Sequence, residues 1–185
     1  MSRNLYIISG PPGVGKSTTS KLLVQTLDKS AYISGDAVSH FPVKGRGKPW
    51  LDKDTNDLTW KNISSLVKNL LDYKYDVVLD YVALPEDIDE LMTELEDYHV
   101  RIIYVVLMVD RQTIIRRDRL RAEEYQMKER SIILLDEFEN HPDLRADNKL
   151  YTNHFTEEQL PEIVSEIINN KKYRLKYLHC YYASN

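Results

Sequence analysis

The sequence is poor in cysteine, and it has neither a long hydrophobic run nor an excess of positive charge. Its single cysteine, Cys180, excludes an internal disulfide and suits a reducing compartment. No apolar stretch reaches the length of a membrane-spanning helix, so we expect a cytoplasmic protein. Lys and Arg total 25 against 29 Asp and Glu, which gives a net charge of −4. Such a chain has no broad positive field, so we expect neither a nucleic acid nor a membrane as its partner.

The length of 185 residues fits one α/β domain, which we expect over residues 1–170, followed by a tail over residues 171–185. Strand-like apolar runs alternate with segments of helical periodicity. This alternation is typical of a parallel sheet covered by helices on both faces. The runs cover residues 5–9, 31–34, 77–80, 100–109 and, more weakly, 149–153. The helical stripes between them are interpreted as buried faces rather than binding surfaces.

Two segments interrupt the alternation. Residues 42–57 combine Gly45, Gly47, Pro49 and Trp50 with a run of charges, and this composition predicts a loop too long for a simple connection. Such a loop is either a lid or substrate-binding element, or a disordered insertion at the surface. The tail, residues 171–185, either packs as an extra element or frays.

A phosphate-binding motif follows the first strand-like run. Residues 10–18 contain the P-loop pattern G-x-x-x-x-G-K-[ST]. Its glycines let backbone N–H groups turn towards a phosphate, and the helix expected to begin near Lys16 points its positive end at the same anion. Lys16 is expected to reach the terminal phosphates and Ser17 to ligate Mg²⁺. We therefore predict a nucleotide-phosphate site that consists of Gly10, Pro12, Gly13, Val14, Gly15, Lys16, Ser17 and Thr18.

Two acids follow strand-like runs. Because parallel strands gather their carboxyl ends at one edge of a sheet, Asp36 and Asp80 are expected beside the P-loop. Asp80 ends the run Val77-Val78-Leu79, an arrangement that predicts a carboxylate for Mg²⁺, with a turn former or helix cap as the alternative. Asp36 either accepts the proton of an attacking hydroxyl or caps a helix that starts near Ala37. Both roles are compatible.

Five arginines fall within residues 111–121 of an otherwise acidic protein. We interpret this density as part of an anion-binding lid, approximately residues 117–131. Arg117 and Arg121 lie four apart and so share a helix face, and Arg130 would return from the far side of the lid. These three are predicted to neutralise the charge that develops during phosphoryl transfer. The remaining arginines fit a solvated, salt-bridged face that uses Asp118 and Glu123.

The chain resembles the small P-loop kinases with an adenylate-kinase-like core. The resemblance rests on the P-loop, the acid after the second run, the strand ending in Asp80 and the arginine-bearing lid. Within that group the chain is similar to the gluconate kinase, shikimate kinase and chloramphenicol phosphotransferase branch, over roughly residues 5–170. The resemblance implies a three-layer α/β fold whose five parallel strands have the order 2-3-1-4-5. It also implies ATP and Mg²⁺ as cofactors. One departure is Tyr81-Val82-Ala83-Leu84, where shikimate kinases have a glycine run.

We therefore expect an ATP-dependent kinase, a monomer or homodimer, that phosphorylates a hydroxyl of a sugar acid, antibiotic or nucleoside. The candidates for its acceptor site are Arg46, Lys48, Trp50, Trp60 and Tyr81. Two other classes stay open. One is a regulatory protein that hydrolyses ATP slowly and signals by its conformation, which acceptor-independent release of ADP would indicate. The other is a polynucleotide 5′-hydroxyl kinase, which the net charge disfavours.

Overall fold

The computed structural model describes residues 3–120, 123 and 126–176. Five parallel strands form one sheet in the order β2-β3-β1-β4-β5, so the predicted fold class and strand order are confirmed. The strands begin and end close to the predicted runs. They are β1 (Arg3–Ser9), β2 (Ser30–Ser34), β3 (Asp76–Asp80), β4 (Val100–Met108) and β5 (Lys149–Tyr151).

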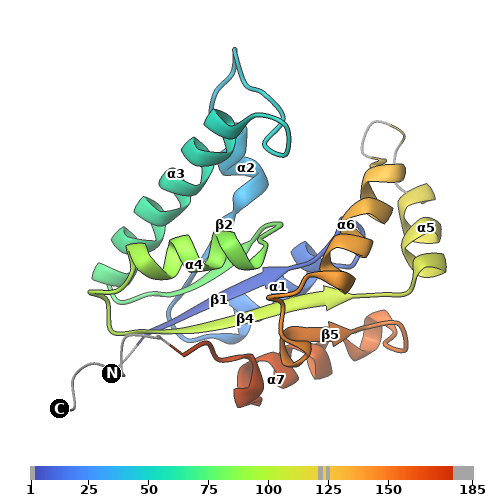
Figure 1. Ribbon diagram of the computed structural model, residues 1–185. Coiled ribbons are helices and arrows are strands. Elements are labelled where there is room, and N and C mark those ends of the chain that lie inside the picture. The colour runs from blue at the N-terminus through green and yellow to red at the C-terminus, as the bar shows by residue number, and fades with distance from the viewer. Residues whose placement is uncertain (1–2, 121–122, 124–125, 177–185) are drawn as a thin grey trace.

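Helices cover the sheet on two sides. Figure 1 shows α3 and α4 over one face and α7 over the other, where α1 packs against it. Helix α5 stands beyond the arrowhead of β4, and α6 packs against α5 and runs back over the end of that strand (Figure 1). Their bounds are α1 (Lys16–Thr26), α2 (Gly35–Ser39), α3 (Lys53–Asp72), α4 (Pro85–Glu94), α5 (Arg111–Arg119), α6 (Glu129–Asn140) and α7 (Leu160–Asn169).

The core lies on both faces of the central strands. In β1 and β3 the side chains of Ile7 and Leu79 on one face and of Ile8 and Val78 on the other are fully buried, which explains why these strands are continuous apolar runs rather than alternating ones. The helices supply apolar stripes that pack on these faces, such as Ile63, Val67 and Leu71 in α3. No helix in the described part of the chain has the length and apolar composition needed to cross a membrane.

The loop between α2 and α3 is shorter than predicted, because α3 begins at Lys53 and so includes the last five residues of the segment expected to be loop. Hydrogen bonds fix this loop at several points. The Arg46 Nε–H donates to the Ser39 carbonyl at 2.6 Å, and the Gly47 N–H donates to Thr55 Oγ1 at 3.0 Å. Thr55 Oγ1 in turn donates to Asp52 at 2.7 Å. These hydrogen bonds argue against a disordered insertion and favour an ordered loop.

The first residues of the tail pack against the sheet. The short 3₁₀ helix η4 (Lys171–Tyr173) buries the Tyr173 side chain completely, and the Leu175 N–H donates to the Ile102 carbonyl in β4 at 3.0 Å. This part of the tail is therefore an extra element of the fold. Residues 177–185, with Cys180, lie outside the described residues.

Candidate functional site

The P-loop connects β1 to α1 and has an unusual backbone at its glycines. Gly10 and Gly15 have φ angles of 128° and 102°, which disfavour any side chain. At Gly10 a Cβ would also lie 2.3 Å from the Leu107 carbonyl oxygen, so the loop approaches β4 too closely for another residue. Helix α1 begins directly after Gly15, at Lys16. The helix N-terminus and the turned backbone therefore offer N–H groups suited to an anion.

Lys16 is held over this loop. Its Nζ donates to the carbonyl oxygens of Gly10 at 2.9 Å and Pro11 at 3.1 Å. Both acceptors belong to the loop itself, so the ammonium group lies where a phosphate would approach the turned N–H groups. The side chain is only half-buried and contributes little to the core.

The two residues predicted for Mg²⁺, Ser17 and Asp80, are linked by Tyr32 on β2. The Tyr32 hydroxyl donates to Asp80 Oδ2 at 2.8 Å, and Asp80 is only 5% exposed at the end of β3. Burial, followed by this hydrogen bond, raises the pKa of Tyr32 well above its usual range, while the hydroxyls of Ser34 and Ser17 act in the opposite direction. The Ser17 hydroxyl and the Asp80 carboxylate thus interact with the same phenol.

These oxygen donors fit Mg²⁺, which takes hydroxyl and carboxylate ligands and keeps several waters or phosphate oxygens. Within the described residues, no group of three His, Cys, Asp or Glu side chains is arranged to hold a metal alone. Ser17 and Asp80 would therefore hold such an ion together with phosphate oxygens rather than in a protein cage.

Asp36 lies at the start of α2 with its side chain exposed. The alternative that Asp36 caps a helix from Ala37 is wrong, because α2 begins at Gly35 and Ser34 is the N-cap, with Oγ accepting from the Ala37 N–H at 3.2 Å. The Asp36 charge acts on a neighbouring phenol instead. Burial first, and then the charges of Asp36 and Asp87, raise the pKa of Tyr81 to about 12, against an opposing effect of Arg46.

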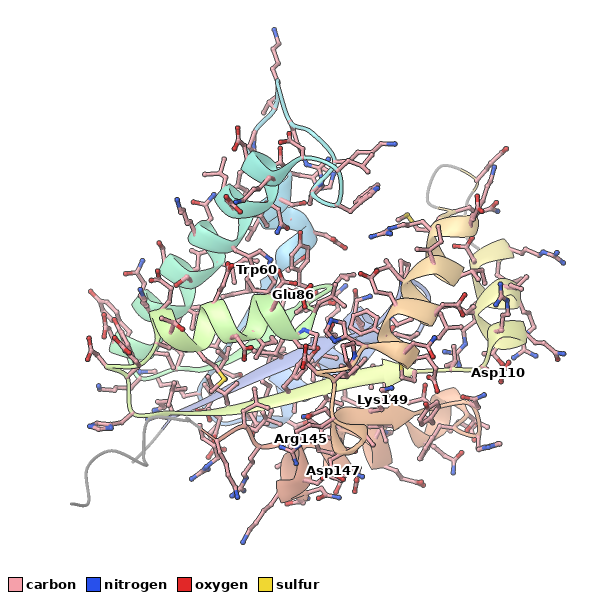
Figure 2. The ribbon with its side chains drawn as sticks, viewed as in Figure 1. Trp60, Glu86, Asp110, Arg145, Asp147 and Lys149 are labelled. Carbon is pink, nitrogen blue, oxygen red and sulfur yellow. The ribbon has the colours of Figure 1, made fainter. Side chains whose placement is uncertain are left out.

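The five acceptor-site candidates fall into two groups. Trp60 and Tyr81 are buried, 8% and 7% exposed, with their rings edge to face at 5.5 Å between centroids. Figure 2 shows Trp60 on the side of α3 that faces the rest of the molecule. Arg46, Lys48 and Trp50 lie instead on the loop between α2 and α3. Of these, Arg46 lines a pocket of about 250 Å³ between α2, the loop and the first turns of α3.

The segment predicted to be a lid runs from the end of α5 to the first turn of α6. Asp110, between β4 and α5 in Figure 2, caps α5 by accepting from the Thr113 N–H at 2.7 Å. Further along α5, the Arg117 Nη1 donates to the Val14 carbonyl of the P-loop at 3.3 Å. One predicted lid arginine thus touches the P-loop. Arg121 lies outside the described residues.

Asp118 corrects the interpretation of a solvated face. Its side chain is 5% exposed, and its two oxygens accept from the N–H groups of Met127 at 3.0 Å and Lys128 at 2.7 Å. This carboxylate therefore ties the end of α5 to the residues just before α6. Arg130, one residue into α6, faces Trp50, with 5.6 Å between its Cζ and the ring centroid.

Sequence reasoning missed three residues of this region. Tyr32 is a single tyrosine in a short strand, and its alignment with Asp80 depends on strand pairing, in which Ser34 lies opposite Asp80. Ser34 was a possible cap, but Asp36 two residues later offered the same signal. Asp118 lies among arginines and suggests ion pairing there. Only the folded chain shows that it accepts from the backbone N–H groups of Met127 and Lys128, just before α6.

These features define a P-loop nucleotide-binding fold. They are the glycine-rich turn between β1 and α1, the lysine over that turn and the sheet order 2-3-1-4-5. The family described as "AAA domain" matches residues 5–138. The chain belongs to this family. No curated protein sequence matches it.

Solved structures with the same fold include several proteins described as kinases. A gluconokinase from Sinorhizobium meliloti is 20% identical, with a TM-score of 0.61 and 89% of each chain covered. An APS kinase from Mycobacterium tuberculosis is 19% identical, with a TM-score of 0.64, and the match covers 91% of this chain and 98% of that one. A sugar kinase from Janibacter is 15% identical, with a TM-score of 0.66 and coverages of 93% and 97%. The resemblance to small P-loop kinases is thus confirmed at the level of the fold.

Proposed function

We propose that the protein is a kinase that transfers the γ-phosphoryl group of ATP to a hydroxyl of a small molecule. The observation that carries the proposal is the contact between lid and P-loop, where the Arg117 guanidinium reaches the Val14 carbonyl at 3.3 Å. A bare nucleotide-binding loop does not need a second cation from a separate helix pair. Phosphoryl transfer does, because negative charge spreads over the equatorial oxygens of the transferred group.

In this proposal the P-loop backbone from Gly10 to Thr18 binds the phosphate chain, and Lys16 exchanges its two carbonyl partners for terminal phosphate oxygens. Ser17 and Asp80 hold Mg²⁺, with Tyr32 fixing the carboxylate. The ion supplies charge neutralisation at the phosphates. Arg117 donates to the transferred group and Arg121 is a further candidate for that contact, whereas Arg130 lies beside Trp50 on the proposed acceptor side.

Asp36 is proposed as the base that accepts the proton of the acceptor hydroxyl. Its side chain is exposed and is not the helix cap, so it is available to a ligand. It lies on the element that opens onto the loop of Arg46, Lys48 and Trp50, the proposed acceptor side. The hydroxyl would lose its proton to Asp36 as its oxygen attacks the γ-phosphorus and the bond to the β-phosphate oxygen breaks, leaving ADP.

The proposal is tested by incubating the protein with ATP, Mg²⁺ and a pool of metabolites, and searching by mass spectrometry for compounds that gain one phosphoryl group. We expect at least one such product with the unaltered protein. The Lys16→Ala variant, purified in the same way, controls for contaminating kinases. ATP consumption at the same rate with and without the pool, and no phosphorylated product, would contradict the proposal and indicate an ATPase.

A further inference from the structure

Two cations from different parts of the chain lie within about 6 Å of the ring centroid of Trp50, in the loop between α2 and α3. The Lys48 Nζ lies 5.8 Å from the ring centroid, and the Arg130 Cζ lies 5.6 Å from it. Lys48 belongs to the same loop, whereas Arg130 belongs to the first turn of α6. The indole is 46% exposed, so the group remains open to solvent. The loop and the lid helix therefore meet at one aromatic ring that carries positive charge.

Neither cation has a carboxylate partner within the described part of the chain. The Nε of Arg130 is also buried without a hydrogen-bond acceptor. A buried donor without an acceptor is rare and costly, because it has lost water and gained nothing in exchange. Lys48 and Arg130 thus place two positive groups beside one ring, and Arg130 has a buried N–H donor without an acceptor. This arrangement is suited to binding an oxygen-bearing anion.

The structure separates the two described lid arginines. Arg117 faces the P-loop through the Val14 carbonyl, whereas Arg130 faces the loop that holds Trp50. Arg46, in the same loop as Lys48, already donates to the carbonyl and hydroxyl oxygens of Ser39. Lys48 and Arg130 are therefore the two cations beside Trp50 that could contact a ligand on the proposed acceptor side.

We infer that the acceptor carries an oxyanion, a carboxylate, sulfate or phosphate, in addition to the hydroxyl that is phosphorylated, and that this oxyanion binds between Lys48 and Arg130 beside Trp50. The inference rests on the proposed kinase function and specifies the class of its substrate. The planar guanidinium of Arg130 presents parallel donors that match two oxygens of one anion. Trp50 holds both cations in place and shields one side of the anion from water. In a chain with a net charge of −4, such a local group is needed to attract an anionic ligand.

The test separates a metabolite extract into acidic and neutral fractions by anion exchange at neutral pH. Each fraction is incubated with the protein, ATP and Mg²⁺, and products that gain a phosphoryl group are identified. Panels of matched compounds accompany the extract: D-gluconate with D-glucitol, glycerol phosphate with glycerol, a sugar sulfate with its sugar, and a nucleoside monophosphate with its nucleoside. We expect the acceptor in the acidic fraction, and the panel arms distinguish the three oxyanions.

The location is tested with Lys48→Gln and Arg130→Gln, using the acceptor that the extract identifies. Each variant should raise KM for the acceptor about 10- to 100-fold, the range expected for a lost hydrogen bond to a charged group, and should leave KM for ATP near its original value. The controls are Lys44→Gln, an exposed lysine of the same loop, and Arg119→Gln, an exposed arginine of α5. Both controls should leave KM for the acceptor unchanged.

A product that forms only from the neutral fraction would overturn the inference and leave the kinase proposal intact. An acidic acceptor whose KM is unaffected by both variants would overturn the assignment to Lys48 and Arg130. If neither fraction yields a phosphorylated product, the proposed kinase function is contradicted and the inference is overturned with it. The outcomes therefore distinguish the two proposals.

Discussion

Lys16 rests on two carbonyl oxygens of its own loop, at 2.9 and 3.1 Å, and is proposed to exchange them for phosphate oxygens. Lys16→Ala should therefore abolish or strongly weaken ATP binding and leave the thermal unfolding temperature close to that of the original protein, because the side chain buries little apolar surface. Calorimetric titration with ATP and Mg²⁺ measures the first effect. Lys21→Ala, at an exposed position of α1, is the matched control. Unchanged ATP affinity in Lys16→Ala would contradict the P-loop assignment.

Tyr32 orients the Asp80 carboxylate through a hydrogen bond of 2.8 Å. Removing its hydroxyl in Tyr32→Phe should raise the Mg²⁺ concentration needed for half-maximal turnover by about 10-fold or more, as for other residues that orient metal ligands. The measurement is initial rate against Mg²⁺ at saturating ATP. Tyr151→Phe removes a similar hydrogen bond to Glu139 at the surface and should not change the Mg²⁺ requirement. Equal behaviour of the two variants would show that Tyr32 has only a structural role.

Asp36 is proposed to act on the acceptor hydroxyl, and the N-cap of α2 is Ser34. Asp36→Asn keeps the size and polarity of the side chain but cannot accept a proton, so acceptor phosphorylation should fall about 10²-fold or more. ATP affinity and thermal stability should stay near their original values. The measurement compares acceptor phosphorylation with calorimetric ATP binding. Full phosphorylation by this variant would remove Asp36 from the mechanism.

At the scale of single elements, Asp87 at the start of α4 makes the free energy of unfolding depend on pH. Its Oδ2 accepts from the Leu84 N–H at 2.8 Å, and burial raises the pKa of Asp87 from 3.8 to about 6. Because the folded-state pKa lies above the unfolded one, the unfolded chain releases this proton first as pH rises. The resulting stabilisation is complete below about pH 4 and is lost as pH rises to about 6.

The variant Asp87→Asn retains an acceptor for the Leu84 N–H and does not titrate. The difference in free energy of unfolding between the original protein and this variant should therefore change by roughly 3 kcal/mol between about pH 3 and pH 7, to the disadvantage of the original protein at the higher pH. Urea denaturation at several pH values measures it. Asp89→Asn, at an exposed position of α4, is the control. Parallel pH curves for Asp87→Asn and the original protein would contradict the account.

The elements differ in how far the sequence predicts them. The P-loop is a local motif, and β3 ends in Asp80 as its apolar run indicated, so both could be located without a structure. The α2–α3 loop was placed too long because charges and a tryptophan mask the start of α3. The role of Asp118 could not be predicted, since it depends on two backbone N–H groups at the start of α6.

At the scale of the whole molecule, the alternation of apolar runs with helical stripes was sufficient to predict a parallel sheet covered by helices. The reason is that each buried parallel strand needs a crossover helix to cover it. The meeting of Trp50 with Arg130 was not predictable in the same way. It joins two elements far apart in the sequence, and each side chain alone is compatible with ordinary surface exposure. What the fold adds is therefore the contact between the loop and the lid, on which the proposed acceptor class depends.

The central claim is that phosphate leaves ATP for an acceptor and not for water. The most direct measurement uses ATP labelled in its γ-phosphate, with Mg²⁺ and the acceptor identified in the metabolite pool, and follows the label over a single turnover. The account predicts that the label appears on the acceptor, with ADP formed at a rate that rises with acceptor concentration and falls in Asp36→Asn. Label found entirely in inorganic phosphate, released at the same rate with and without the acceptor, would contradict it.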